Sequence, residues 1–142
     1  MADTTVTASV LTWLEAHPAI AAAGLPVALE HLPAEGVDAV MLSSLTGDPY
    51  VRRYKSGGFV APYDFAVVLR ANPLDTTGRL DAMGLLGDIA ASIEDRTAWP
   101  SAPAGYAYDA LEMRTLPAPV ARYDSGAEDY QATFTLTYRK RG

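Results

Sequence analysis

The chain contains no cysteine, and this absence removes several classes of protein chemistry at once. Without thiols there are no disulfides, no thiolate-bound zinc or iron–sulfur cluster and no cysteine nucleophile. Histidine is also scarce: neither His17 nor His31 belongs to a metal-binding motif such as H-E-x-x-H. No G-x-S-x-G or S-x-x-K motif supplies a serine nucleophile with a base. We therefore expect no enzyme activity, no cofactor and no metal site.

Basic residues are few relative to acidic ones. Lys and Arg number 11 against 17 Asp and Glu, which gives a net charge of −6. Because an acidic surface repels phosphates, we expect no binding of nucleic acid across the whole surface. Apolar runs are far shorter than the ~20 residues that span a bilayer, and no signal peptide is visible. We expect a soluble protein without membrane contact that stays inside the cell that makes it.

The length of 142 residues suits a single domain, residues 1–142, with a core of its own. Near the start of this domain, apolar residues recur at offsets of three and four, which predicts a helix. Asp3 or Thr4 can cap the start of this helix. The proline after His17 should break the helix there, and Gly24 should end it.

A second helix is predicted over residues 76–96, capped by Thr76 or Thr77. Its expected apolar stripe, which should pack on a sheet, consists of Leu80, Met83, Leu86, Ile89, Ala90 and Ile93. On the opposite side three aspartates recur every seven residues: Asp81, Asp88 and Asp95. The simplest interpretation of these carboxylates is a solvated helix face.

Most of the remaining chain has the pattern of strands. Apolar and polar residues alternate strictly over residues 130–138 and less strictly over residues 61–71. Shorter strands are expected at residues 37–44, 50–55, 111–116 and 120–124, the last two flanking a turn at Pro117–Pro119. Residues 98–108 are expected to form a surface loop. Because strands occur in clusters, we predict an α+β fold, with a mostly antiparallel sheet of about five to six strands packed against two helices.

One short stretch, YVRRYKSGG at residues 50–58, concentrates positive charge in this acidic chain. Its candidate interaction residues are Arg52, Arg53, Tyr54, Lys55, Gly57 and Gly58. The glycines can adopt the positive φ of a tight turn, which favours a hairpin. A P-loop needs a glycine directly before the lysine and a helix after the serine, and neither is present here.

Of the two tryptophans, Trp13 is expected in the core. Trp99 lies among prolines and alanines just after the second predicted helix. Two interpretations remain open for Trp99. Its ring covers the end of that helix, or it is exposed as an anchor for a partner protein.

Taken together, these segments resemble the small tail terminator proteins of long-tailed bacteriophages, often labelled minor capsid or tail completion proteins. The likeness rests on Tyr50–Tyr54 with its Gly-Gly turn, the Tyr63-Asp64-Phe65 strand start, the helix over residues 80–93 and the segment Ala121–Gly126. The last block, G-x-x-D-Y-Q-A-x-F-x-L-x-Y over residues 126–138, is the most telling. The likeness extends over nearly the whole chain.

The resemblance implies a tail-terminator-like α+β domain that assembles with itself into a hexameric ring. Such a ring caps the tail tube in the virion, stops tube polymerisation and joins the tail to the head. The implied partners are further copies of the chain, the tail tube protein and a head–tail connector or stopper protein. DNA passes through such a ring without sequence-specific binding. The protein would be made in the host cytoplasm and reside in the tail or neck of the virion.

Two sets of residues are candidates for this role. The cationic hairpin over residues 50–58, together with Trp99, is a candidate interface with a neighbouring subunit or the tube. A solvated hairpin is the competing interpretation. If the second helix faces inward, Asp81, Asp88 and Asp95 would line the bore, where carboxylates repel DNA phosphates.

Three other functions stay open at this point. One is another neck protein of the virion, such as a head completion or connector-stopper subunit. Another is a small-ligand-binding α+β domain whose pocket is formed by Arg53 with Tyr50, Tyr54 and Tyr63. The most remote is an acyltransferase-like enzyme, which the missing base and nucleophile disfavour.

Overall fold

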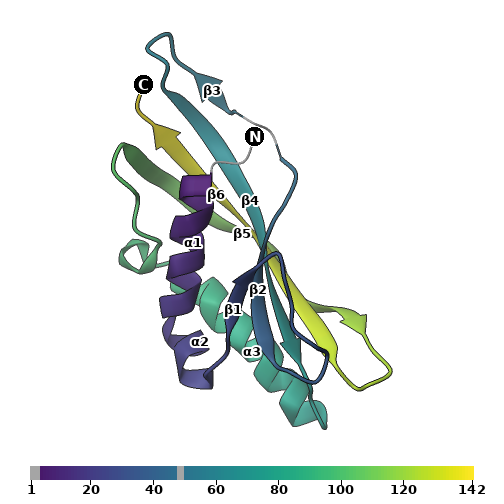
Figure 1. The fold of residues 1–142 in the computed structure, drawn as a ribbon. Coiled ribbons are helices and arrows are strands. Elements are labelled where there is room, and N and C mark those ends of the chain that lie inside the picture. The colour runs from purple at the N-terminus through teal and green to yellow at the C-terminus, as the bar shows by residue number, and fades with distance from the viewer. Residues whose placement is uncertain (1–3, 48–49) are drawn as a thin grey trace.

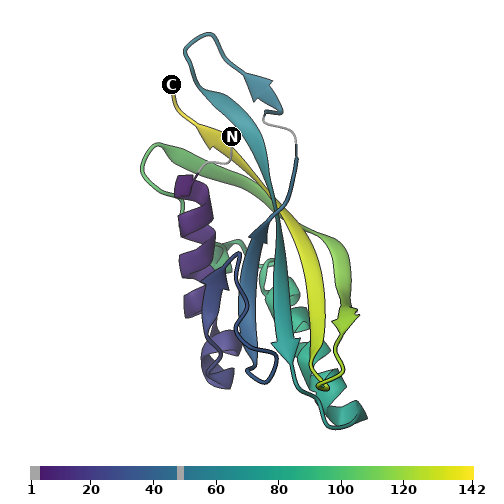
Figure 2. The ribbon, with the colours of Figure 1, turned by 45° about the vertical axis from the view of Figure 1, so that its right-hand side comes forward.

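A computed structural model describes residues 4–47 and 50–142. It has the expected α+β architecture, with helices covering one face of a mostly antiparallel sheet (Figures 1 and 2). The helices are α1 (Thr4–Ala16), α2 (Pro18–Ala23), α3 (Thr76–Ser92) and the short 3-10 helix η1 (Arg96–Ala98). The strands are β1 (Val27–Leu29), β2 (Ala39–Ser44), β3 (Arg52–Arg53), β4 (Phe59–Ala71), β5 (Tyr106–Arg122) and β6 (Glu128–Lys140). In the described part of the chain, no helix is both long and apolar enough to cross a bilayer.

The order of strands across the sheet is β1-β2-β4-β6-β5, and β3 pairs with the start of β4. β1 and β2 run parallel, whereas the other pairs run antiparallel. β1 was absent from the sequence-based prediction because its three residues are too few to display a period of two. It forms only because β2 offers a neighbouring backbone edge.

The centre of the sheet is the pairing of β4 with β6, which runs unbroken from Phe59 opposite Lys140 to Ala71 opposite Glu128. As the alternation predicted, one face of each strand is buried beneath the helices. Phe65 and Phe134 lie directly opposite each other on that face, stacked at 5.4 Å between ring centroids and fully buried. This continuous aromatic and aliphatic surface is the largest part of the core.

The break predicted in the first helix is confirmed at His17. Pro18 begins α2, where its missing N–H costs nothing, and the His17 side chain caps the helix by accepting a hydrogen bond from the Ala19 N–H at 3.2 Å. Gly24 ends α2 with φ of 66°, as expected. Asp3, the proposed alternative cap of the first helix, lies outside the described residues.

The second predicted helix differs in extent, cap and buried side. It ends at Ser92, and Asp75, rather than Thr76 or Thr77, caps it by accepting a hydrogen bond from the Gly78 N–H at 2.9 Å. The buried residues follow one spacing of four, three and four: Ala82, Leu86, Ile89 and Ile93. Leu80 and Met83 were wrongly assigned to this side and are exposed. Leu80 precedes Leu86 by six residues, which rotates it by about 120° away from the sheet.

The two short strands predicted after the second helix are instead one long strand, β5. Pro117 and Pro119, expected to form a turn, lie inside it. Proline is tolerated there because β5 is an edge strand with β6 on one side only. On its other side no strand of the described residues would receive a hydrogen bond from the missing N–H. Register shifts along β5 interrupt its pairing with β6 around these prolines.

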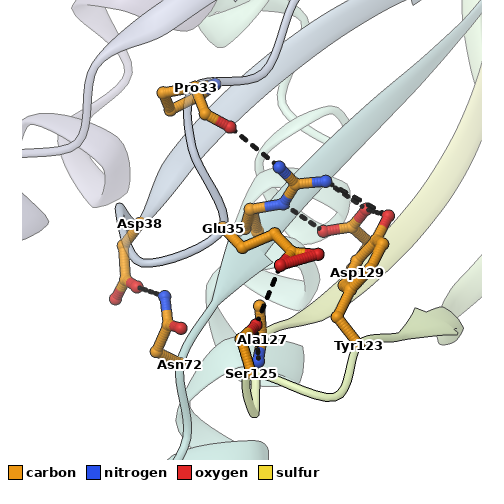
Figure 3. A network of polar contacts seen from close by, with 9 residues as sticks. Pro33, Glu35, Asp38, Asn72, Tyr123, Ser125, Ala127 and Asp129 are labelled. Atoms are coloured by element: carbon orange, nitrogen blue, oxygen red, sulfur yellow. Dashed lines mark hydrogen bonds and ion pairs between the residues drawn. The ribbon is translucent and has the colours of Figure 1, made fainter.

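A buried ion pair holds the end of the central pairing together (Figure 3). Arg70 and Asp129 lie opposite each other on β4 and β6, on the face away from the helices. Arg70 Nε and Nη2 donate to the two carboxylate oxygens of Asp129 at 2.8 and 3.0 Å, and the Tyr123 hydroxyl donates to Asp129 Oδ2 at 2.7 Å. Arg70 Nη1 also donates to the Pro33 carbonyl at 2.8 Å, which ties the loop before β2 to the sheet.

A second carboxylate, Glu128, is held on the helix-covered side of the same strand. It accepts hydrogen bonds from the Tyr130 hydroxyl at 2.6 Å and from Arg79 Nε of α3 at 3.1 Å. The bond from Tyr130 and the attraction of the nearby arginines lower the pKa of Glu128. Burial, together with the bond to Glu128, raises the pKa of Tyr130 to about 12. Arg79 thereby fastens α3 to the sheet.

Removing one partner of the buried pair should destabilise the fold strongly. We expect Arg70→Met to lower the free energy of unfolding by about 3–5 kcal/mol, because it leaves the Asp129 carboxylate buried without its cation. Arg139→Met is the matched control, since its pair with Asp109 is largely exposed, and should cost less than about 1 kcal/mol. Urea unfolding measures both changes, and equal losses would contradict the role of burial.

The same end of the sheet should make the fold sensitive to acid. Burial raises the pKa of Asp129, but the hydrogen bonds from Arg70 and Tyr123 and the guanidinium charge outweigh it, so the pKa is lowered overall. Both Asp129 and Glu128 therefore add stability above the carboxyl pKa of the unfolded chain, about 4, and lose it as pH falls through their lower native values.

Urea unfolding at a series of pH values checks this dependence. We expect the free energy of unfolding to be level near neutral pH and to fall below about pH 5. Asp129→Asn should be less stable at neutral pH and should show a shallower decline in acid. A variant whose acid dependence equals that of the unaltered chain would contradict the assignment to Asp129.

Candidate functional site

The cationic stretch forms the expected hairpin, at one tip of the sheet (Figure 1). Arg52 and Arg53 form β3 and pair with the first residues of β4. The turn is closed by two backbone bonds, from the Tyr54 N–H to the Gly58 carbonyl and from the Gly57 N–H to the Tyr54 carbonyl. Gly57 has φ of 93°, a value that favours glycine. A Cβ on Gly58 would lie 2.9 Å from the Lys140 carbonyl oxygen, so the close approach of the last strand also requires glycine.

Further cations, from the end of β6, lie at this tip, and the sequence analysis did not assign them to it. Because Phe59 pairs with Lys140, the end of β6 lies beside the hairpin. The resulting set of charged side chains, here named the basic tip, is Arg52, Arg53, Lys55, Arg139, Lys140 and Arg141. It holds more than half of the 11 basic residues of the chain. The run Arg-Lys-Arg at residues 139–141 is visible in the sequence, but only the strand register shows that it lies beside the hairpin.

Aromatic rings accompany these cations. The Arg53 guanidinium lies over the Tyr50 ring at 4.8 Å, and Lys140 Nζ lies over the Tyr106 ring at 5.5 Å. Arg139 is paired with Asp109 at 2.9 Å. Within residues 4–47 and 50–142, no carboxylate lies in ion-pair distance of Arg52, Arg53 or Lys55. The hairpin thus presents positive charge that no carboxylate of the described residues pairs with, and the Arg53 guanidinium packs on an aromatic ring.

A second surface feature lies beside α1. A groove of about 1100 Å³ runs between α1, the end of α3 and the segment of residues 98–103. Trp13 of α1 fixes that segment by donating its indole N–H to the Ala98 carbonyl at 2.7 Å, and Ser9 donates to the Ser101 carbonyl at 2.7 Å. Trp13, expected in the core, is therefore only partly buried and forms a wall of the groove. We name this feature the α1 groove.

Trp99 forms part of the same groove. Its indole N–H donates to the carbonyl of Ile93, the residue that follows α3, at 2.5 Å. The Arg96 guanidinium lies over its ring at 4.9 Å. The ring thus covers the end of the helix, as one of the two interpretations held. The other interpretation, an anchor for a partner, stays a prediction.

His17 and Ser92 meet at the groove, but their hydrogen bonds are oriented against catalysis. His17 Nδ1 accepts the Ala19 N–H, so the ring proton of the neutral imidazole is on Nε2. Nε2 then donates to Ser92 Oγ at 2.9 Å, and Ser92 donates its own hydrogen to the Ile89 carbonyl at 2.7 Å. A serine nucleophile needs a histidine that accepts its proton, and here the histidine is the donor.

Burial lowers the pKa of His17, although Asp88 opposes this shift, so the imidazole is neutral at pH 7. Over the described ranges, no group of three or more histidine and carboxylate side chains is placed to hold a metal ion.

The three aspartates do not share one helix face. Asp81 and Asp88 are exposed on α3, and Asp88 also lines the α1 groove. Asp95 lies beyond the end of α3 and caps η1, accepting hydrogen bonds from Thr97 Oγ1 at 2.8 Å and the Thr97 N–H at 3.0 Å. The bond from the Thr97 hydroxyl is the main cause of its lowered pKa. A bore-lining role remains a prediction for all three.

The tyrosines of the ligand-binding alternative are separated. Tyr63 is buried on the core face of β4, and its hydroxyl is hydrogen-bonded to Ser44 Oγ at 2.8 Å. Tyr50 packs on Phe59, and Tyr54 lies on the exposed hairpin. The structure therefore separates buried Tyr63 from the exposed hairpin residue Tyr54, and a small-ligand pocket formed by these side chains stays a prediction.

Comparison with known proteins gave one kind of match. No family model and no curated protein matches the sequence. Among solved structures, a chain from a structure titled "Virion of native gene transfer agent (GTA) particle" has a similar fold, with a TM-score of 0.61. The superposition covers 93% of this chain and 92% of that chain, at 15% sequence identity. A likeness at this identity shows a shared fold over nearly the full length of both chains.

Proposed function

We propose that this chain is a structural virion protein that caps a phage tail tube as a ring. The ring stops tube polymerisation and joins the tail to the head. The observation that carries the proposal is the full-length fold likeness to a chain of a virion particle. The motif G-x-x-D-Y-Q-A-x-F-x-L-x-Y over residues 126–138, which resembles the last strand of tail terminator proteins, also supports it, and most of this segment lies in β6 (Glu128–Lys140).

The distribution of charge supports an assembling role. The basic tip holds more than half of the cations, although the chain as a whole has a net charge of −6. The rest of the subunit is therefore strongly acidic. Two such subunits attract each other when the tip of one meets the body of the next, and they repel when like ends meet. Such head-to-tail contacts close into rings when the rotation between copies allows it.

Termination then needs no chemical reaction. One side of the ring binds the end of the tail tube as a further tube subunit would, and the other side presents a surface that tube subunits do not bind. Growth stops because the site for the next subunit is occupied by a different shape. The hydrogen bonds of His17 and Ser92, which are wrongly oriented for nucleophilic catalysis, agree with a protein that acts only by binding.

The ring also has to let DNA pass. Asp81 and Asp88 are the exposed carboxylates of α3, whereas Asp95 is engaged by Thr97. If α3 faces the bore, these carboxylates keep DNA phosphates from adhering. A ring structure with α3 on the outer rim would exclude this part of the proposal.

The capping role is tested by mixing the purified chain with the tail tube protein of the same particle. In negative-stain images we expect six-fold rings at the ends of tubes, and tube lengths that stop increasing once the chain is added. Tubes that continue to grow at the same rate would contradict the proposal. Co-purification with the portal or adaptor and not with the tube would indicate the alternative, a connector-stopper subunit.

The hairpin has its own test. Reversing two charges in Arg52→Glu/Arg53→Glu should abolish rings on tubes, because the basic tip then repels the acidic surface that it meets. Both side chains are exposed and lack ion pairs within the described residues, so the main loss is the contact of Arg53 with the Tyr50 ring, and the unfolding free energy should change by less than about 1 kcal/mol. Intact rings formed by this double variant would show that the hairpin is only a solvated turn.

A further inference from the structure

We propose that the hairpin of one copy, residues 50–58, docks in the α1 groove of the next copy. This inference rests on the proposed ring and names the contact that builds it. The hairpin lies at the tip of the sheet (Figures 1 and 2), whereas the residues that line the groove belong to α1, α2, the end of α3 and the segment 98–103. Their pairing is therefore head-to-tail and leaves one free hairpin and one free groove until the ring closes.

The groove has the electrostatic character to receive a cation. α1 ends at Ala16 and α3 ends at Ser92, and both residues line the groove. The carboxyl end of a helix carries partial negative charge, which a basic residue in the last turn commonly offsets. Neither helix has one. Asp88 adds a full negative charge at the same place.

The other titratable groups at the groove do not cancel this potential. His17 is neutral at pH 7 because burial lowers its pKa. Arg96 does not line the groove: its guanidinium stacks on the ring of Trp99, a groove residue, and donates to the Tyr108 carbonyl at 2.7 Å. Asp88 is therefore the charged side chain of the groove lining that a cation from another chain would meet.

The hairpin has the complementary composition. Tyr50, Val51 and Tyr54 leave 41%, 64% and 44% of their surface exposed, on a segment that projects from the fold. Exposed apolar side chains grouped in this way mark a contact surface. Arg52, Arg53 and Lys55 lie among them in the sequence, so the hairpin offers aromatic rings and cations together. The indole rings of Trp13 and Trp99 can pack against the hairpin's aromatic rings, and the Asp88 carboxylate can pair with its cations.

The size of the groove agrees with such an occupant. A volume of about 1100 Å³ exceeds the ~300–1,000 Å³ of a typical small-molecule pocket, and it is open along α1. It can accept several side chains of a β-turn at once. The contact would also assign Asp88 to the subunit interface and leave Asp81 as the carboxylate of α3 available to a bore.

Cysteine cross-linking tests the contact directly, because the chain has no cysteine of its own. Ser56→Cys places a thiol on the hairpin, and Thr12→Cys places one in the groove. Leu74→Cys is the matched control, since Leu74 is 99% exposed and lies away from the groove. The hairpin variant, carrying a tag, is mixed with one of the other two and with tube protein, and then mildly oxidised.

We expect cross-linked pairs of the hairpin and groove variants, at least fivefold more abundant than pairs of the hairpin and control variants. Imaging of the same samples separates two kinds of failure. Rings without the hairpin–groove cross-link, or with equal cross-linking to the control, would overturn this inference and leave the capping role intact. Absence of rings in the unaltered chain would overturn the capping role itself.

A charge exchange gives a second, independent readout. Asp88→Arg should weaken ring assembly by roughly tenfold, because it places a cation against the cations of the docked hairpin. Adding Arg53→Glu to the same chain should restore part of the loss. Loss without recovery would contradict a contact between the two positions. Binding of an apolar dye to the isolated chain, unchanged when rings form, would show that a small molecule and not the hairpin fills the groove.

Discussion

The unbroken thirteen-residue pairing of β4 with β6 is the constraint on which the rest of this structure depends. A single register decides three things that are far apart in the sequence. It aligns the aromatic residues of both strands on the face that the helices cover. It sets Arg70 opposite Asp129, where the two charges are buried and joined by two hydrogen bonds. It also brings the end of the chain beside the hairpin and so creates the basic tip. A shift of one residue would turn every side chain of one strand to the other face and abolish all three.

The parts of the fold that the sequence could predict are those governed by local rules. The alternation in residues 130–138 and 61–71 gave the buried faces of β6 and β4, and Pro18 and Gly57 marked a helix break and a turn. The parts that it could not predict depend on a neighbour. β1 exists because β2 offers it an edge. Pro117 is tolerated inside β5 because that strand has an open side. The rotation of α3 was misjudged because several apolar stripes are possible on a helix this rich in alanine and leucine, and only contact with the sheet selects one.

The candidate site divides in the same way. The cations of residues 52–55 are adjacent in sequence, so composition alone drew attention to them. The cations at the end of β6 join them only through strand pairing, and the α1 groove is assembled from α1, the end of α3 and a loop that no motif connects. Trp99 could be recognised as unusual because it is a tryptophan among prolines. Trp13 lies at a position of the apolar helix stripe, so the sequence could not distinguish it from a core residue. A surface that is assembled by tertiary contacts cannot be recognised in the sequence unless some of its residues already stand out by their type or clustering.

The proposed cap for a growing tube must differ on its two sides, and the asymmetry of this subunit fits that proposal. Its helices cover one face of the sheet, its positive charge gathers at one tip, and its open groove lies along α1. Identical surfaces at both ends would let subunits pair symmetrically, which satisfies two copies and ends assembly at a dimer. When the two surfaces differ, each added copy still leaves one binding surface free for the next copy. Only closure of the ring fills the last free surface. In the proposed ring, the contacts between neighbouring subunits would use these different surfaces, and the two faces of the ring would remain free to differ, one for the tube and one for the head.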